Sequence, residues 1–260
     1  MPIKHPVEGC FFRHIIELNE YIYIMIYITK IKTILLSFVI ILTTIASTYL
    51  IQTNKSFAQE TTESTPRLGI TIVLDAGHGG IDPGSIGKVT KVTESDLNLT
   101  IVNKLEMLFV TSGIDVVKTR TDENGLYGIY SKDYKIRDMQ ARKEIILKSN
   151  ACLVISIHMN SFSQSKYRGA QVFYDQNVKD SQTLALSIQN CFANDLPASD
   201  KGISIGDYFI LKCANTIPSV LCECGYLSNP DDEKLLTTTE YQDKVAYSIY
   251  KGTISYLNTN

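Results

Sequence analysis

Short apolar runs alternate with amphipathic stretches along most of the chain. Residues 69–75 (GITIVLD) are rich in β-branched side chains and run up to Gly77, which predicts a strand. Residues 94–112 carry apolar side chains at 97, 99, 101, 102, 105, 108 and 109, a spacing that predicts an amphipathic helix. Thr93 or Ser95 offers a side chain that can cap the start of this helix.

The same alternation continues to the C-terminus. We expect further strands over 114–119, 152–157, 171–174, 208–212 and 220–224, and helices over 136–149, 181–192, 231–236 and 239–257. Strands that alternate with helices predict an α/β fold, here a single domain with a mostly parallel, twisted sheet and helices on both faces. In such sheets the reactive groups gather at the carboxyl ends of the strands.

The N-terminal part of the chain has a different pattern. Residues 33–51 are apolar and uncharged, Lys30 and Lys32 precede them, and small residues lie where a signal peptidase would cut before Gln59. This is the layout of a secretory signal peptide. The run also approaches the roughly 20 residues that span a bilayer, so an uncleaved signal anchor is the alternative. Both alternatives place the remainder outside the cytoplasm, because the lysines stay inside.

The start of translation is a related question. Glu8, Glu17 and Glu20 lie ahead of the apolar run, which is unusual for a signal peptide. Met25 would begin a more regular signal than Met1, because the only charged residues between Met25 and the apolar run are lysines. The pattern therefore favours Met25 as the true start.

These features divide the chain into three parts. Residues 1–58 form the segment with the signal peptide or anchor, 59–68 a polar, threonine-rich linker, and 69–260 the folded domain. The first part holds five Lys and Arg and three Asp and Glu, so it carries +2 of the total −2 and leaves about −4 for the rest. A mildly acidic domain argues against a nucleic acid as the partner, and we expect membrane contact only through the N-terminal segment.

Five cysteines follow the signal segment, so they cannot all pair with one another. Cys222 and Cys224 are two apart on a predicted strand and therefore share a face. A Cys-x-Cys half of a zinc site is one interpretation, but no second Cys or His pair at zinc spacing accompanies it. Small buried thiols are the favoured interpretation.

Candidate chemistry lies at the predicted strand ends. His78 lies in a Gly-His-Gly-Gly turn, and His158 ends the run LVISIH; they are the only histidines beyond the N-terminal segment. Glu223 lies inside an apolar run, where a carboxylate is costly unless it is paired or meets a metal. Taken alone, His158 could equally be a structural histidine at a strand end, and Glu94 could be a structural carboxylate that the helix dipole stabilises at a helix start. Two imidazoles and a carboxylate can hold Zn²⁺ with one open position, and a further carboxylate can act as general base, so the set predicts a metal hydrolase.

The same residues lie in stretches that resemble a known family, the zinc-dependent N-acetylmuramoyl-L-alanine amidases of bacterial cell walls (amidase-3 type). The resemblance runs from about residue 70 to the C-terminus. The similar stretches are IVLDAGHGGIDPGSIG (72–87), TESDLNL (93–99), LVISIHMNS (153–161), RGAQVFY (168–174) and IPSVLCECGYLSNPDDEKLL (217–236). The resemblance implies that His78, Glu94 and His158 are the zinc ligands and Glu223 the catalytic carboxylate. It also implies that the substrate is peptidoglycan, cleaved at the amide between the lactyl group of muramic acid and L-alanine.

The likeness extends to the spore-cortex branch of this family, which implies a role in muramic-δ-lactam formation and germination. That role would place the enzyme in the forespore intermembrane space. We expect Asp75 to be a partner of His78, Asn160 to orient His158 or bind substrate, and Arg142 to anchor its helix by an ion pair. A site with three protein ligands can bind zinc weakly, so an extracytoplasmic activator or scaffold protein is a further expectation.

Three rival interpretations remain open from the sequence. A general cell-wall autolysin of the same family would share every residue named above. A zinc peptidase acting on the stem peptide would need the same metal set, although the chain has no His-Glu-x-x-His helix. A non-catalytic wall-binding or partner-docking domain would have no reason to retain all four chemical residues.

Overall fold

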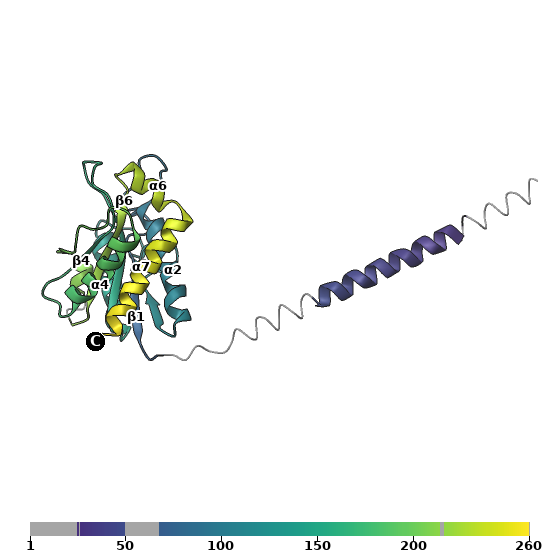
Figure 1. Cartoon of the computed structure of the whole chain (residues 1–260), viewed down its shortest axis with the longest axis horizontal. Coiled ribbons are helices and arrows are strands. Elements are labelled where there is room, and N and C mark those ends of the chain that lie inside the picture. The colour runs from purple at the N-terminus through teal and green to yellow at the C-terminus, as the bar shows by residue number, and fades with distance from the viewer. Residues whose placement is uncertain (1–24, 26, 50–67, 214–215, 260) are drawn as a thin grey trace, which may run out of the picture. The chain divides into compact units, whose positions relative to one another are not determined.

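The computed structural model describes residue 25 and residues 27–49, 68–213 and 216–259. The chain divides into two compact units, Met1–Ser64 and Thr65–Asn260. The first unit contains a helix over Tyr27–Tyr49, of 23 residues and mean hydropathy 1.9, which is long and apolar enough to cross a membrane (Figure 1). Such a helix is compatible with both a signal peptide and an anchor. The predicted cleavage site and nearly all of the predicted linker lie outside the described residues.

The second unit is built on one six-stranded sheet in the order β2-β1-β3-β6-β4-β5. Its strands are β1 (Thr71–Ala76), β2 (Asp115–Lys118), β3 (Leu153–Asn160), β4 (Gln171–Tyr174), β5 (Ser204–Ile205) and β6 (Ser219–Tyr226). All neighbouring strands pair in parallel except β4 and β6, which are antiparallel. The predicted mostly parallel sheet is therefore confirmed.

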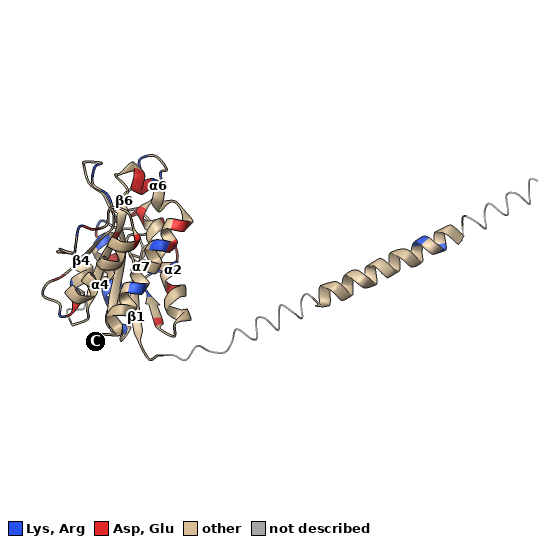
Figure 2. Cartoon of the chain, viewed as in Figure 1, with Lys and Arg blue, Asp and Glu red and all other residues tan. Residues whose placement is uncertain are grey.

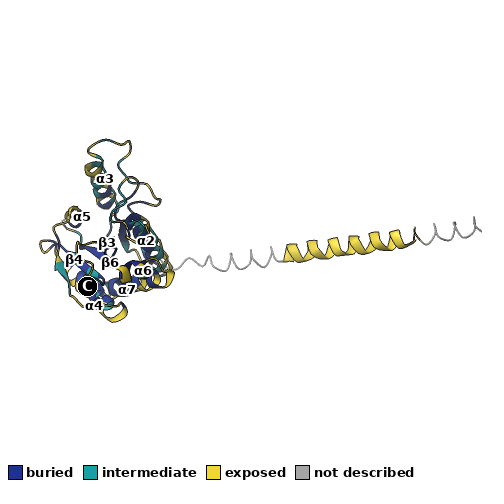
Figure 3. Ribbon diagram, turned by 90° about the horizontal axis from the view of Figure 1, so that it is seen from above, coloured by how far each residue is buried: buried dark blue, intermediate teal, exposed yellow. Residues whose placement is uncertain are grey.

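Helices cover both faces of this sheet, as Figure 3 shows from above. They are α2 (Glu94–Thr111), α3 (Tyr134–Lys148), α4 (Ser181–Asp195), α5 (Phe209–Lys212), α6 (Pro230–Leu236) and α7 (Thr239–Leu257). The larger core cluster joins α2, α4 and α7 to one face, and a smaller cluster joins α3 and α5 to the other. Alternation along β1 explains this division: Ile72 and Leu74 belong to the larger cluster, and Val73 to the smaller one.

One predicted strand is wrong. Residues 209–212 form the short helix α5, in which Ile210 and Leu211 are buried and Phe209 is partly exposed, as is Tyr208 just before the helix. A run of four apolar residues is too short for its periodicity to separate a strand from one helical turn. The two-residue strand β5 lies just before it and was not expected, because so short a strand leaves no alternating pattern.

Of the two residues predicted as possible caps of α2, Thr93 and Ser95, the structure shows the first. Thr93 is the cap, and its hydroxyl accepts a hydrogen bond from the Asp96 amide. Ser95 lies inside the helix and contacts the Thr93 hydroxyl at 3.0 Å. Because Thr93 is the cap, Glu94 is the first residue of the helix. The backbone of Glu94 is therefore held in place beside the carboxyl ends of β1 and β3.

Candidate active site

A pocket of about 640 Å³ lies at the carboxyl ends of β1, β3 and β6. His78 follows β1, His158 lies near the end of β3, Glu223 lies on β6, and Glu94 begins α2; all four line the pocket. His158 and Glu223 are register partners on neighbouring parallel strands, so their side chains leave the sheet on the same face. The fold thus brings together all four residues that the sequence singled out.

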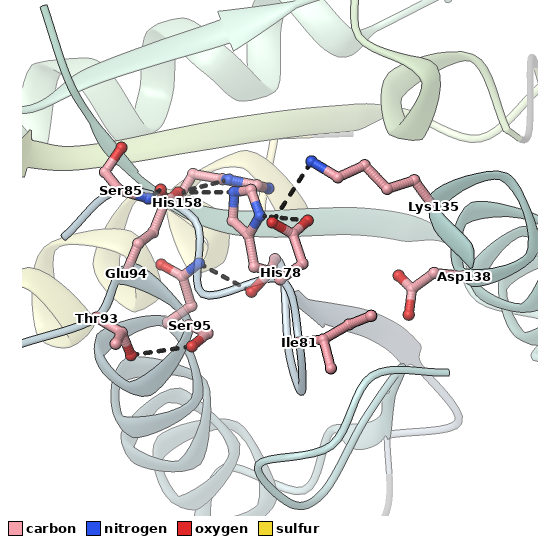
Figure 4. A network of polar contacts seen from close by, with 12 residues as sticks. His78, Ile81, Ser85, Thr93, Glu94, Ser95, Lys135, Asp138 and His158 are labelled. Carbon is pink, nitrogen blue, oxygen red and sulfur yellow. Dashed lines mark hydrogen bonds and ion pairs between the residues drawn. The ribbon is translucent and has the colours of Figure 1, made fainter. Parts of the chain in front are cut away.

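Three of these residues form a compact group of possible metal ligands (Figure 4). The Glu94 Oε1 atom lies 2.9 Å from His158 Nδ1 and 3.3 Å from His78 Nε2, and one ligand atom from each of the three lies within 4.8 Å of the others. Ligand atoms bound tetrahedrally to zinc at about 2.0–2.1 Å are about 3.3 Å apart. The two distances to Glu94 and the His-Glu-His donor set therefore fit a zinc ion.

The Glu94 carboxylate is held by backbone groups as well as by the histidines. The Ser85 amide donates to Oε2 at 2.8 Å, and the Met159 amide donates to Oε1 at 3.0 Å. Burial opposes ionisation, but hydrogen bonds and charge from His158 and His78 hold the pKa of Glu94 well below its usual range. The carboxylate is therefore ionised, as a metal ligand must be.

His78 is oriented by a second carboxylate. Its backbone is left-handed at φ 62°, and its Nδ1 atom lies 3.0 Å from Asp82 Oδ2, which turns Nε2 toward Glu94. Although burial alone would lower it, Glu94 and Asp82 raise the pKa of His78 to about 9. A proton on Nε2 competes with a metal ion for the same atom, so binding of an ion would release it.

Two glycines leave room for these side chains. A Cβ on Gly77 would lie 2.2 Å from the ring of His158. A Cβ on Gly84 would lie 2.6 Å from Glu94 Oε2 and 2.8 Å from the His78 ring. No other residue fits without displacing a possible ligand.

Glu223 has the properties of a group that exchanges protons. It is 8% exposed, and its Oε2 atom has no hydrogen-bond partner among the described residues. Burial, followed by repulsion from Glu94, raises the pKa of Glu223 to about 8, while His78 acts in the opposite direction. A carboxyl group with a pKa near neutrality can both accept and return a proton.

The comparison with known proteins identifies the family. The model of the Amidase_3 family, described as N-acetylmuramoyl-L-alanine amidase, matches residues 72–255. The chain belongs to this family. The amidase is therefore an enzyme that hydrolyses the bond between N-acetylmuramic acid and L-alanine in peptidoglycan.

Three relatives of the amidase are informative. The germination-specific N-acetylmuramoyl-L-alanine amidase of Bacillus subtilis (strain 168) is 36% identical over 197 residues, which cover 74% of this chain and 82% of the relative. The structure of the CwlD amidase from Clostridioides difficile in complex with the GerS lipoprotein superposes with a TM-score of 0.71 at 43% identity, covering 74% of this chain and 100% of that one. The crystal structure of an N-acetylmuramoyl-L-alanine amidase from Clostridium difficile 630 superposes with a TM-score of 0.66 at 30% identity, covering 74% of this chain and 98% of that one.

Asp75 does not contact His78 in the way we expected. Its Oδ1 atom accepts hydrogen bonds from Arg142 and Thr119, each at 2.7 Å, and its Oδ2 atom accepts one from Ser156 at 2.6 Å. The position against the His78 ring belongs to Asp82 instead. The sequence could not separate the two, because Asp82 lies in a Gly- and Pro-rich loop whose path depends on the fold.

Arg142 forms the ion pair predicted for it and does more. Besides Asp75, it binds Asp138 at 2.6 Å and donates to the backbone carbonyls of Ala76 at 2.7 Å and His78 at 2.6 Å. Asp75 therefore supports the His78 loop indirectly, through the guanidinium that both share.

A second buried arginine, Arg120, was missed. It donates to the carbonyls of Ala76, Gly77 and Ser95 and thus ties the His78 loop to the first turn of α2. Its only sequence signal is a position just after β2, at the edge of the sheet where the pocket lies.

The remaining expectations have mixed outcomes. Asn160 lines the pocket at the end of β3, and its role toward His158 or substrate stays a prediction. The five cysteines Cys152, Cys191, Cys213, Cys222 and Cys224 are free thiols. Cys222 and Cys224 are fully buried in the larger core cluster, which confirms the interpretation as packed thiols.

Proposed function

We propose that the amidase uses one zinc ion held by His78, Glu94 and His158, with Glu223 as the carboxylate that moves protons. The observation that carries this proposal is the convergence of three ligand atoms within 4.8 Å of one another in the wall of a pocket that also contains Glu223. When bound, zinc supplies Lewis-acid chemistry, because it polarises a carbonyl oxygen and acidifies a water molecule.

The chain's own residues prepare the rest of the reaction. Asp82 keeps the His78 ring turned toward Glu94, and two backbone amides hold the Glu94 carboxylate in place. Glu223 takes a proton from the attacking water and then delivers it to the amino group of the departing L-alanine. Its apolar surroundings support this role, because they keep its pKa near neutrality.

Metal and proton transfer can be tested together. Glu94→Gln should lose bound zinc, whereas Glu223→Gln should keep zinc and fold but lose at least about 100-fold in kcat. Metal content is measured by elemental mass spectrometry, and activity by mass spectrometry of digested peptidoglycan. Glu240→Gln is the matched control, since this acid pairs with Lys244 on the exposed face of α7. Unchanged cleavage by Glu223→Gln would remove it from the mechanism.

The same digest separates the amidase from a stem-peptide peptidase. Intact stem peptides released from the glycan support amide cleavage at muramic acid, and trimmed stems support the peptidase. A non-catalytic wall-binding domain would give neither product.

We further propose a role in muramic-δ-lactam formation in the spore cortex and in germination. The support is the likeness to a germination-specific amidase and to the CwlD amidase. Muropeptide profiling of the cortex from a deletion strain tests it: muramic-δ-lactam should be absent. Normal lactam content with altered vegetative wall turnover would favour a general autolysin.

The proposed organisation is an N-terminal segment (1–58), a linker (59–68) and a catalytic domain (69–260) that works outside the cytoplasm, in the forespore intermembrane space. The apolar helix Tyr27–Tyr49 supports export by either a signal peptide or an anchor. N-terminal sequencing of the mature protein distinguishes them, because cleavage leaves Gln59 as the first residue. The same measurement on the precursor tests Met25 as the start.

An extracytoplasmic partner protein completes the proposal. The similar CwlD structure is a complex with a lipoprotein, which supports a partner of that kind here. Affinity capture from sporulating cells should recover it, and full activity of the isolated enzyme without any recovered partner would argue against it.

A further inference from the structure

Glu233, on α6, is a buried acid that the mechanism does not use. Its side chain is outside the pocket lining, and the residue is only 1% exposed. No ion pair joins it to a cation among the described residues. Figure 2 shows the acidic first turn of α6 to which it belongs.

The partners of this carboxylate are amides of a distant loop. Oε1 accepts from the Val89 amide at 2.9 Å, the Thr90 amide at 2.6 Å and the Thr90 hydroxyl at 2.8 Å. Oε2 accepts from the Lys88 amide at 3.1 Å. Four donors around one carboxylate supply the compensation that a buried charge requires.

The tip of the loop that these amides belong to has few other contacts to hold it. Its tip, residues 88–91, is exposed, with Val89 at 74% exposure, so no apolar packing fixes it. Lys91 has a left-handed backbone at φ 62°. Exposed loop tips without buried side chains open readily, so the carboxylate of Glu233 is the main restraint on this tip, whereas Val92 nearer the base packs against the larger core cluster.

The base of the same loop carries the ligand Glu94. The Gly87 amide donates to the Val92 carbonyl at 2.9 Å, and an antiparallel bridge joins Ile86 to Thr93, so the loop is a small hairpin over residues 85–94. At its base the Glu94 amide donates to the Ser85 carbonyl at 2.8 Å, and the Ser85 amide donates back to Glu94 Oε2 at 2.8 Å. One arm of the hairpin therefore orients the ligand carboxylate that the other arm carries.

The helix that carries Glu233 is itself fixed to the site. Asn229 caps α6 by accepting from the Asp231 and Asp232 amides, and Asp232 accepts from the Tyr226 amide at the end of β6 and from the Gly169 amide. Because β6 also carries Glu223, the carboxylate of Glu233 links the strand of the proton-transferring group to the hairpin of a metal ligand.

We propose that Glu233 is a positioning residue of the metal centre, which holds the 85–94 hairpin in the conformation where the Ser85 amide meets the Glu94 carboxylate. It acts on the metal only through this hairpin and touches neither metal nor substrate. The inference rests on the proposed ligand set. Glu233 should therefore tighten metal binding and have little effect on the core of the fold.

The test compares Glu233→Gln with Asp231→Asn in the full chain purified in detergent. Both substitutions remove one acid from the first turn of α6, but Asp231 is exposed, and its side chain pairs with Arg168 rather than with the loop. Zinc affinity is measured by competition with a chromophoric chelator. Glu233→Gln should weaken it about 10-fold or more, whereas Asp231→Asn should stay close to the wild type.

Hydrogen exchange of the metal-free protein supplies a readout that a merely structural role would not give. In Glu233→Gln the amides of Ser85, Lys88, Val89 and Thr90 should exchange faster, while those of β1 and β3 keep their protection. Excess zinc should restore kcat. Thr90→Val, which removes only the hydroxyl donor, should shift affinity in the same direction by less, and it replaces Glu233→Gln if that variant does not fold.

The outcomes separate this inference from the proposed function. Unchanged zinc affinity in Glu233→Gln, with affinity lost in Glu94→Gln, would overturn the role of Glu233 alone. Faster exchange throughout β1 and β3 would also overturn it, because the loss of affinity would then be general unfolding. Retention of full affinity in Glu94→Gln would instead overturn the ligand set.

Discussion

Asp75→Asn tests whether the buried ion pair between Asp75 and Arg142, beside the candidate active-site pocket, stabilises the folded state. Asp75 is 1% exposed and lies 2.7 Å from Arg142. The substitution keeps the shape of the side chain and its capacity to bond Thr119 and Ser156, but it removes the negative charge. Arg142 keeps Asp138 as a second partner at 2.6 Å, so its charge is not left alone.

The expected magnitude comes from proton linkage. Burial opposes ionisation of Asp75, but Arg142 and hydrogen bonds from Ser156 and Thr119 lower its pKa from 3.8 to about 2. A lowering of that size corresponds to about 2–3 kcal/mol. This lies below the roughly 3–5 kcal/mol lost when a buried pair is broken outright, as expected while Asp138 remains. We therefore expect Asp75→Asn to lower the free energy of unfolding by about 2–3 kcal/mol at pH 7.

The sign of the pH dependence follows from the lowered pKa. The stabilisation is fully present above about pH 5, where the carboxylate is ionised in the unfolded chain too, and it is lost as the pH falls toward 2. The difference between wild type and variant should shrink to about half by pH 3.

Urea unfolding followed by far-UV circular dichroism, with a chelator present throughout, measures this difference. Asp243→Asn is the control: this exposed acid pairs with Lys104, and its loss should change stability by less than about 1 kcal/mol. Equal stability of Asp75→Asn and wild type at pH 7 would refute the reasoning, and so would a difference that stays constant down to pH 3.

Three further predictions concern the residues around His78. Gly77→Ala should displace His158 and abolish tight zinc binding, because the new Cβ would lie 2.2 Å from its ring; isothermal titration with zinc measures this. Asp82→Asn should lower the pKa of His78 from about 9 toward its ordinary value in metal-free protein, seen by NMR titration, and weaken zinc binding about 10-fold. Arg120→Lys should lower the free energy of unfolding by about 2–4 kcal/mol in thermal or urea denaturation, since it loses several bonds to buried carbonyls.

Each of these has a result that would contradict it. Wild-type zinc affinity in Gly77→Ala would mean that the His158 ring is not confined as described. An unchanged titration of His78 in Asp82→Asn would show that Asp82 does not act on that ring. Full stability of Arg120→Lys would mean that water or the lysine replaces the lost bonds.

The sequence predicted the parts of the fold whose patterns are long. The strands around 69–75 and 152–157 and the helices over 94–112 and 239–257 are present, because many residues define each pattern. The prediction of a strand over 208–212 was wrong because one helical turn and one short strand can be formed by the same short apolar run. The antiparallel direction of β4 was equally out of reach, since strand direction depends on a connection and leaves no mark on the strand.

The same distinction applies to the site. His78 and Glu223 could be singled out because each is chemically unusual in its local sequence, whereas His158 and Glu94 needed the whole set of residues and the resemblance to a family. Asp82 could not, because an aspartate in a turn is ordinary until the fold places it 3.0 Å from an imidazole. Interactions between segments far apart in the chain, such as that of Glu233 with Thr90, leave no periodic or local signal.

The alternation of side chains along β6 also has a redox consequence. Glu223 faces the pocket, whereas Cys222 and Cys224 on either side face the core and have no exposed surface. Burial, with the nearby acid adding to it, raises the pKa of both thiols, so the reactive thiolate is scarce. An exposed free cysteine this close to the candidate metal ligands would be open to oxidation or could bind a metal ion in their place. Because neighbouring residues of β6 point to opposite faces of the sheet, both thiols are shielded from oxidants and kept away from the candidate metal ligands.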